Sequence, residues 1–182
     1  MNDDDYILVC ALKQGSNQAF QQLYKRYSVQ VYGFILQMVR SQDQAQEIFQ
    51  HVFVKLWENR GHINPEDSFN AYLYTIARNS VYSYWRQCLN RQKLESYLTI
   101  HSERSSIQTE RAIEDKDFRA YLDAVIDLLP KRCKEVFILR HRYSKSYREI
   151  SWRLNISEKT VDNQLQKAVA FIRRRMMPEV FV

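Results

Sequence analysis

The sequence predicts an all-α protein of two small helical domains joined by a flexible linker, and three observations lead to that prediction. The chain has 182 residues but only three glycines and three prolines, so long stretches lack the residues that interrupt helices. A hydrophobic content of 45% is sufficient for packed cores. Apolar residues recur three and four positions apart through most of the chain, which is the period of an amphipathic helix.

Composition excludes several classes of protein. Cys10, Cys88 and Cys133 form no ligand spacing with each other or with the four histidines, so we expect free thiols, no metal and no cofactor. Neither a phosphate-binding glycine loop nor a nucleophile motif is present, so we expect no catalytic residues and no enzyme activity. No apolar run approaches the roughly 18 residues of a membrane span, and the N-terminus is acidic, unlike a signal peptide. The expected location is the cytoplasm.

Positive charge is concentrated in the last third of the chain. Residues 118–182 carry 14 Lys and Arg against 7 Asp and Glu, whereas residues 1–92 carry 9 against 8. This distribution suggests that the basic C-terminal domain binds phosphates and that the near-neutral N-terminal domain also contacts a protein.

The first domain is expected to span residues 1–92 and to begin with two core helices. Ser16 can cap a helix whose apolar stripe continues to Met38, and a second helix runs from about Asp43 to Asn59. The outward arc of the second helix is polar apart from one valine, a weak sign of a docking surface on its own. Residues 60–67 contain a Gly and a Pro and read as a loop.

A helix from Ser68 to Gln87 follows, and its two faces differ in chemistry. One side is a usable core stripe, formed by Phe69, Leu73, Ile76, Ala77, Ser80 and Tyr84. The other side interleaves aromatic rings with arginines and is formed by Tyr74, Arg78, Tyr82, Trp85 and Arg86, with Asn79 beside it. Such a face suits stacking of unpaired bases, at roughly 1–3 kcal/mol per base. The alternative is that some of these rings pack beneath a neighbouring element.

Residues 93–117 are rich in polar residues and read as a linker or a loosely packed helix, and residues 118–182 form the second domain. Helices are expected at Phe118–Leu129 and Lys131–Arg142. A short helix from Ser146 to Leu154, a turn at Asn155 and a helix capped by Ser157 then make a helix-turn-helix. The outer face of its second helix carries side chains that can read base edges in a major groove, namely Lys159, Thr160, Asn163, Gln164, Gln166 and Lys167.

Three blocks of the sequence resemble the extracytoplasmic-function sigma factors of bacterial RNA polymerase, a group of the sigma-70 family. AQEIFQHVFVKLWENR at 45–60 is similar to the family's region 2.2, and FNAYLYTIARNSVYSYWR at 69–86 looks like regions 2.3 and 2.4. The block at 129–174, which begins with LPKRCKEVFILRHRYSKSYREISWRLNISEKTVDNQ, looks like region 4. Their order and spacing make the resemblance specific.

The resemblance implies a role for each face. The N-terminal domain would dock on the polymerase β′ clamp through Glu47, Gln50, His51, Val54 and Glu58. It would read the nontemplate strand of the −10 promoter element through Tyr74, Arg78, Asn79, Tyr82, Trp85 and Arg86, with the loop 60–68 as a pocket for an extruded base. The C-terminal domain would contact the β flap and read the −35 element through Lys159, Thr160, Asn163, Gln164, Lys167 and Arg148. Similarity to the iron-transport regulators suggests a membrane-bound anti-sigma factor, with no insertion of this chain into the membrane.

Three departures from the family pattern affect these roles. Glu47 stands where an Asp is usual, His51 where an acid is usual, and Ser83 where an Asp is common. The promoter preference of relatives therefore does not transfer to this chain. The principal alternative is a free-standing helix-turn-helix regulator that binds operators without polymerase. The aromatic–arginine face argues against it, because a duplex binder has no need of such a face.

Overall fold

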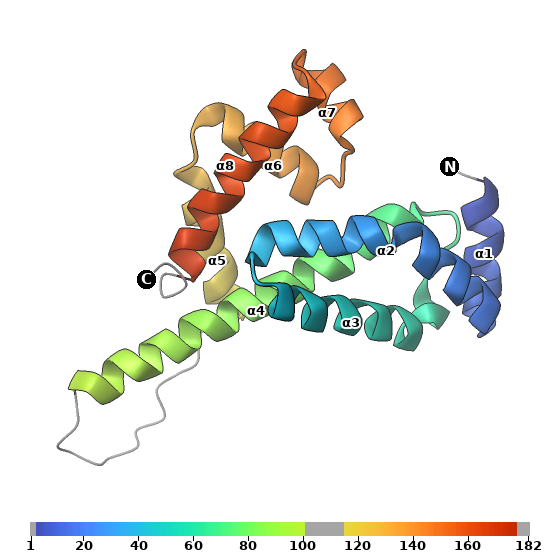
Figure 1. Cartoon of the computed structure of the whole chain (residues 1–182), viewed down its shortest axis with the longest axis horizontal. Helices are drawn as coiled ribbons and strands as arrows, with labels where there is room; N and C mark the ends of the chain where they lie inside the picture. The colour runs from blue at the N-terminus through green and yellow to red at the C-terminus, as the bar shows by residue number, and fades with distance from the viewer. Residues whose placement is uncertain (1–2, 101–114, 178–182) are drawn as a thin grey trace. The chain divides into compact units, whose positions relative to one another are not determined.

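The computed structural model describes residues 3–100 and 115–177, with side chains at residues 5–92 and 115–177. Across these residues it contains eight α-helices, one 3-10 turn and no strand (Figure 1). The chain divides into two compact units, residues 1–81 with 139–146 and residues 82–138 with 147–182. The all-α prediction is therefore confirmed.

The first unit is built on two long helices that pack along each other, α2 (Asn17–Val39) and α3 (Gln42–Glu58) (Figure 1). Ser16 and Ser41 cap them by accepting from the backbone N–H groups of Ala19 and Gln44, as the sequence predicts at Ser16. A short helix, α1 (Asp3–Lys13), packs on α2 and on the 3-10 turn η1 (Arg60–His62). The apolar core includes Leu12, Leu23, Val31, Ile35, Val52, Leu56 and Leu73.

The second unit holds the helix-turn-helix. It comprises α5 (Asp115–Asp127), α6 (Lys131–His141) as far as Ile138, α7 (Tyr147–Leu154) and α8 (Glu158–Met176), together with the end of α4 (Phe69–Ile100) from Tyr82 onward. Asn155 adopts the left-handed conformation with φ of 52°, which permits the tight turn between α7 and α8. Ser157 caps α8 by accepting from the Thr160 N–H. Figure 1 shows α7 and α8 in orange to red.

Three features depart from the sequence-based expectation. No helix is predicted before Ser16, yet α1 is present and buries Val9 and Leu12. Helix α4 continues to Ile100, well beyond the expected end at Gln87, and α5 begins at Asp115. The expected linker at 93–117 is thus helical at both of its described ends, and its part at 101–114 lies outside the described residues.

Candidate nucleic-acid interface

The outer face of α8 is open to solvent. Lys159, Asn163 and Lys167 recur at a spacing of four, so they lie on one side of the helix, and all three are exposed. The opposite side is buried through Val161, Leu165 and other apolar residues. Helix α8 therefore presents a row of an amide and two ammonium groups, which can donate to base edges or to phosphates.

Three other residues that were predicted to bind the −35 element lie outside this exposed row. The Gln164 side chain is partly buried, and its Oε1 accepts from the Cys133 Sγ at 3.0 Å, so it is turned toward α6. The Thr160 hydroxyl lies 2.9 Å from that of Ser157 and belongs to the helix cap. Arg148 of α7 is exposed, with its guanidinium 5.0 Å from the ring centre of Trp152, a side chain that is 75% exposed. Lys159 and Asn163 are thus more accessible to a partner than Gln164.

The aromatic face of α4 is largely covered, contrary to the expectation that it faces solvent. Tyr74 is only 8% exposed, and it packs edge-on against Phe34 at 5.1 Å with the Arg140 guanidinium 4.4 Å above its ring. Trp85 is fully buried and stacks on Tyr82 at 5.6 Å. A helical wheel divides α4 into one core side and one outer side, but neighbouring residues cover α4 on more than one side. For Tyr74 and Trp85 the alternative of packing beneath a neighbour describes this structure.

The arginines of the same face also have partners. Arg78 donates to the His141 carbonyl oxygen and to Asn79 Oδ1, the latter at 3.5 Å, and Arg86 forms an ion pair with Asp115. Asn79 is exposed, and Tyr82 is partly buried with its ring 6.4 Å from Phe118. Of the six residues predicted for −10 recognition, Asn79 is therefore the most accessible in this structure.

Segment Leu139–Ser146 places a buried histidine in the first unit. His141 is 3% exposed and its ring lies 5.2 Å from Phe34. Burial lowers the pKa of His141 to about 3, and the positive charges of Arg140 and Arg78 act in the same direction. The imidazole is neutral at physiological pH.

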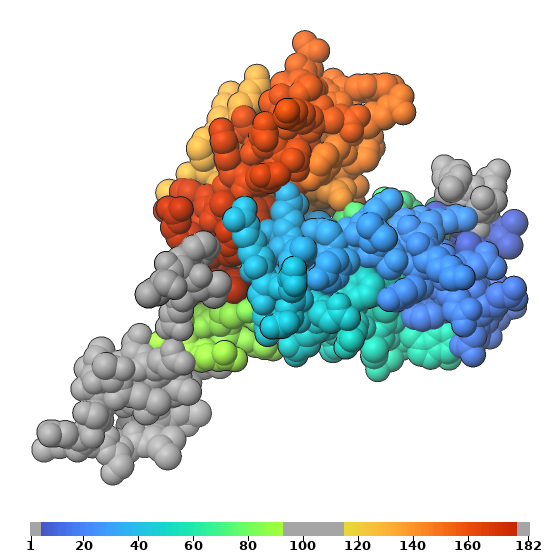
Figure 2. Space-filling model, viewed as in Figure 1, coloured from blue at the N-terminus to red at the C-terminus, as the bar shows by residue number. Residues whose placement is uncertain are grey.

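The arc of α3 that the sequence pattern predicts to face outward is exposed. Each of its five residues, Glu47, Gln50, His51, Val54 and Glu58, is exposed. Val54 is 52% exposed although it is apolar, and it lies among polar and acidic side chains. Figure 2 shows α3, in teal, at the surface of the first unit. An exposed apolar residue ringed by polar groups is a suitable centre for a protein contact.

A cavity of about 330 Å³ lies between α1 and the loop that leads into α4. Its lining comprises Asp5, Tyr6, Val9, Pro65, Glu66, Asp67, Ser68, Phe69 and Asn70. Sequence reasoning assigned an extruded base to loop 60–68 but missed the α1 side of this cavity. The signal was present, because Val9 and Leu12 are spaced as a buried pair behind acidic residues that favour a helix N-terminus.

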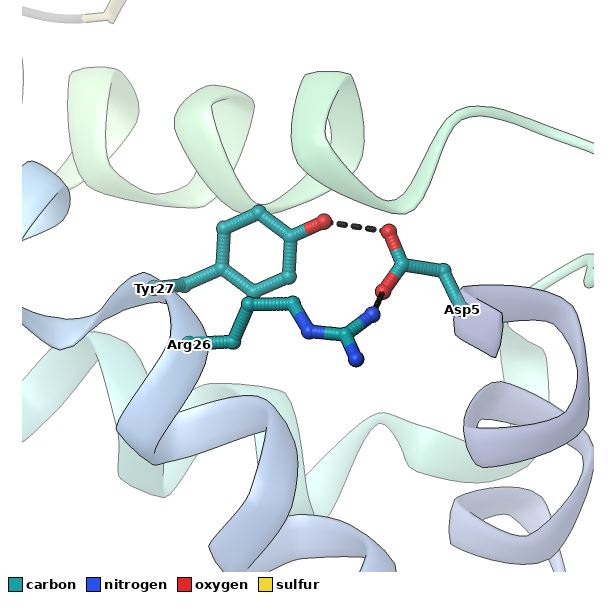
Figure 3. A network of polar contacts seen from close by, with 3 residues as sticks. All are labelled: Asp5, Arg26 and Tyr27. Carbon is teal, nitrogen blue, oxygen red and sulfur yellow. Dashed lines mark hydrogen bonds and ion pairs between the residues drawn. The ribbon is translucent and has the colours of Figure 1, made fainter. Parts of the chain in front are cut away.

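Asp5 anchors α1 to α2. Its two carboxylate oxygens accept from the Tyr27 hydroxyl and from the Arg26 guanidinium (Figure 3). Burial and the hydrogen bond to Asp5 raise the pKa of the Tyr27 hydroxyl. These two contacts join side chains that are separated by 21 and 22 positions in the sequence, and they fix α1 at one wall of the cavity.

Metal-binding clusters and membrane-spanning helices are both absent from residues 3–100 and 115–177. No group of three or more His, Cys, Asp or Glu side chains there could hold a metal ion. None of the helices in these ranges is both long and apolar enough to cross a membrane.

Comparison with known proteins gives two family matches, one N-terminal and one C-terminal. Residues 23–92 match the model of Sigma-70 region 2, and residues 119–172 match that of Sigma-70, region 4. The first match contains α3 and the described side chains of α4, and the second contains the helix-turn-helix. Helix α1 lies outside both.

Two related sequences agree with these matches, and one solved structure is also similar. The chain is 30% identical over 142 residues to RNA polymerase sigma factor CarQ of Myxococcus xanthus, covering 76% of this chain and 78% of CarQ. It is 25% identical over 182 residues to the ECF RNA polymerase sigma-E factor of Haemophilus influenzae, covering 96% of each. A solved structure of CnrH in complex with the cytosolic domain of CnrY aligns with a TM-score of 0.47 and 21% identity, covering 94% of this chain and 96% of that one.

Proposed function

The chain belongs to the extracytoplasmic-function group of the sigma-70 family, and from this we propose that it directs RNA polymerase to promoters with a −10 and a −35 element. Sigma factors bind core RNA polymerase and promoter DNA and act in transcription initiation. The observation that carries the proposal is the presence of regions 2 and 4 in one chain, each with an exposed polar surface of its own.

Docking on the polymerase β′ clamp is assigned to the α3 arc centred on Val54. Its support is the exposure of all five arc residues on a helix whose other side is packed into the core. Burying a half-exposed valine against an apolar partner contributes roughly 1 kcal/mol. The acidic Glu47 and Glu58 at the rim would favour encounter with a basic surface. Contact with the β flap is assigned to the second unit.

Reading of the −35 duplex is assigned to α8, with Asn163 and Lys159 at base edges and Lys167 and Arg148 at phosphates. The exposed row on α8 has the spacing of a recognition helix. A lost bidentate base contact costs roughly 1–3 kcal/mol, whereas a lost phosphate contact weakens binding to every sequence alike. A loss of base discrimination therefore identifies a residue that contacts base edges, and a uniform loss of affinity identifies one that contacts phosphates.

Reading of the −10 strand is assigned to α4, and it requires some of the rings to be uncovered. Among the described residues no hydrogen-bond partner reaches the buried Nε1 of Trp85, and a buried donor without a partner is destabilising. Exposure of Trp85 on promoter opening would relieve that cost. Stacking on Tyr74 would likewise require Arg140 to leave its ring.

Promoter melting requires more free energy than base stacking on these rings can supply. Each base-pair step costs a mean of roughly 1.4 kcal/mol, and each aromatic stack returns roughly 1–3 kcal/mol. Two or three stacks hold one or two extruded bases, so the remaining binding surface must come from polymerase. The chain would act in the cytoplasm and be controlled by an anti-sigma factor, which we infer from its membership of this group.

Run-off transcription from genomic fragments with bacterial core polymerase, with and without the protein, tests the proposal. New discrete transcripts that depend on the protein are expected. Val54→Asp should abolish them by blocking polymerase binding, whereas Val29→Asp, which alters an equally apolar and more exposed side chain on α2, should not. The absence of transcripts, together with tight binding of the protein alone to a specific duplex, would favour a free-standing regulator.

Base preference provides the finer test. Asn163→Ala or Lys159→Ala should reduce discrimination at individual −35 base pairs, while Lys25→Ala, an exposed cation on α2, serves as the matched control. An unchanged preference in both α8 variants would contradict the assignment of this face to the −35 element.

A further inference from the structure

The cavity beside α1 is negatively charged, although the chain carries a net charge of +6. Three of its lining residues are acidic, Asp5, Glu66 and Asp67, and none of the described lining residues is Lys or Arg. Arg26 of α2 forms an ion pair with Asp5 and compensates its charge (Figure 3). Within the described side chains neither Glu66 nor Asp67 has an ion pair with a cation, so these two carboxylates give the cavity its charge.

Asn70 adds a hydrogen-bond acceptor to the same cavity. Its Oδ1 is buried, and no hydrogen-bond partner reaches it within residues 5–92 and 115–177. Almost all buried polar groups of folded proteins have a partner, so this atom calls for an N–H donor from a ligand. A ligand with several N–H groups and a positive charge would satisfy Asn70 and both carboxylates together.

The cavity also contains an aromatic face and apolar walls. Tyr6 of α1 is 38% exposed, whereas Val9 and Phe69 are almost fully buried. The pKa of the Tyr6 hydroxyl is raised by Cys10 and, to a smaller extent, by the negative charge of Glu66, so the ring lies near the loop carboxylate. A cation over such a ring is stabilised, and the cation is more often Arg than Lys. At about 330 Å³ the cavity is at the small end of the range for ligand sites.

We propose that this cavity binds the guanidinium group of an arginine side chain that belongs to a protein partner. A guanidinium has five N–H donors in one plane, which suit the Asn70 Oδ1 and the carboxylates of Glu66 and Asp67, while its flat face lies against Tyr6. A lysine ammonium has three donors and no flat face, so it matches the cavity less well. The inference goes beyond the proposed function and does not depend on promoter recognition.

A protein is favoured over a nucleic-acid strand and over a free small cation. Glu66 and Asp67 repel phosphate groups, so a DNA strand meets unfavourable charge at this cavity. Ile7, next to Tyr6 on α1, is apolar and 67% exposed, and a partner protein can bury it beside the charged contact. A free guanidinium compound makes no use of that apolar surface. The cavity is therefore assigned to a protein contact, in place of the extruded base that the family resemblance implies for loop 60–68.

The first experiment measures the ligand chemistry with the full-length protein and a defined probe. N-acetyl-L-arginine methylamide would be titrated while the NMR signals of the Tyr6 ring, assigned with Tyr6→Phe, are recorded. We expect saturable shifts, and roughly fivefold weaker binding of the corresponding citrulline compound, which has a similar shape but no charge. Equal binding of the two compounds, or shifts that do not saturate, would overturn the inference.

Variants then assign the binding to the cavity. Glu66→Gln and Asp67→Asn change exposed residues and should each weaken arginine binding by up to roughly fivefold, whereas Asp43→Asn, an exposed acid on α3, should leave it unchanged. Asn70→Leu should weaken binding without lowering the melting temperature, because it removes a buried acceptor that has no partner. Arginine binding that is insensitive to all three cavity variants contradicts the assignment.

A photo-cross-linker identifies the source of the arginine. With p-benzoylphenylalanine in place of Ile7, the full-length protein in cells should cross-link to a protein. Glu66→Lys should abolish the cross-link, Asp43→Lys should retain it, and replacing the partner's arginine with glutamate should restore it in Glu66→Lys. A cross-link to DNA instead, or none that depends on Glu66, overturns the assignment to a protein. In the second case, saturable arginine binding identifies a free guanidinium compound as the ligand.

These outcomes are separate from those of the proposed function. Run-off transcripts that depend on the protein support its role with polymerase whether or not arginine binds. An absence of transcripts overturns that role and leaves the arginine titration to decide the inference.

Discussion

Acidification should destabilise the protein through His141. This side chain is buried and its pKa in the folded state is lowered from 6.5 to about 3, so the folded protein resists protonation that the unfolded chain accepts. Stability due to the neutral imidazole is therefore complete above pH 6.5 and is lost as the pH falls toward 3. When the unfolded chain binds one more proton than the folded protein, each pH unit changes the free energy of unfolding by about 1.4 kcal/mol. The unfolding free energy should be lower by about 1.4 kcal/mol at pH 5.5 and by about 2.7 kcal/mol at pH 4.5.

Urea unfolding at pH 7.5, 5.5 and 4.5, followed by circular dichroism, measures this loss. His141→Phe keeps an aromatic ring beside Phe34 but removes the titrating group, so the difference between wild type and variant isolates His141. Ring resonances of His141 in NMR spectra should also stay unshifted from pH 7.5 to pH 5. Equal acid sensitivity of the two proteins, or a His141 signal that titrates near pH 6.5, would refute the reasoning.

Substitutions at three further positions test the local structure by thermal or urea unfolding. Gly33→Ala should stabilise by up to about 1 kcal/mol, because Gly33 is exposed within α2 and a Cβ there meets no atom within 4 Å; destabilisation would show that α2 is not a regular helix at this point. Asn155→Ala should destabilise by about 1 kcal/mol, since φ is 52° there, while Asn155→Gly should be tolerated; equal effects would contradict the left-handed turn. Ser157→Ala should cost about 1 kcal/mol through loss of the α8 cap, Ser157→Asp should preserve stability, and a neutral Ala variant would show that the cap is not used.

Local signals predicted the second unit well. Asn155 and Ser157 determine the turn and the cap through their own backbones and side chains, so a single sequence is sufficient to place them. The exposed row at Lys159, Asn163 and Lys167 follows from the 3.6-residue period alone. Gln164 was less predictable, because its orientation depends on Cys133, which is 31 positions away.

The faces of α4 were harder to predict because they depend on the tertiary structure. A helical wheel reports which residues share a side, but it does not report how many other elements enclose the helix. Tyr74 and Trp85 therefore appeared to be outward and proved to be buried. The extent of α4 to Ile100 was missed for a related reason, since the polar residues after Arg91 provide no apolar stripe to mark a helix. The roles of these residues in DNA binding remain predictions.

The contrast in tryptophan burial provides an optical reporter within the protein. The indole of Trp85 is sealed from solvent, whereas that of Trp152 is 75% exposed and that of Trp57 is partly covered by the Arg60 guanidinium at 4.4 Å. Iodide in solution should quench the emission of Trp152 while leaving that of Trp85 intact. With Trp57 and Trp152 replaced by Phe, the remaining emission would come from Trp85 alone. Uncovering of that ring would then appear as a red shift with new sensitivity to iodide, so the step at which α4 becomes accessible could be timed by stopped-flow fluorescence without an attached dye.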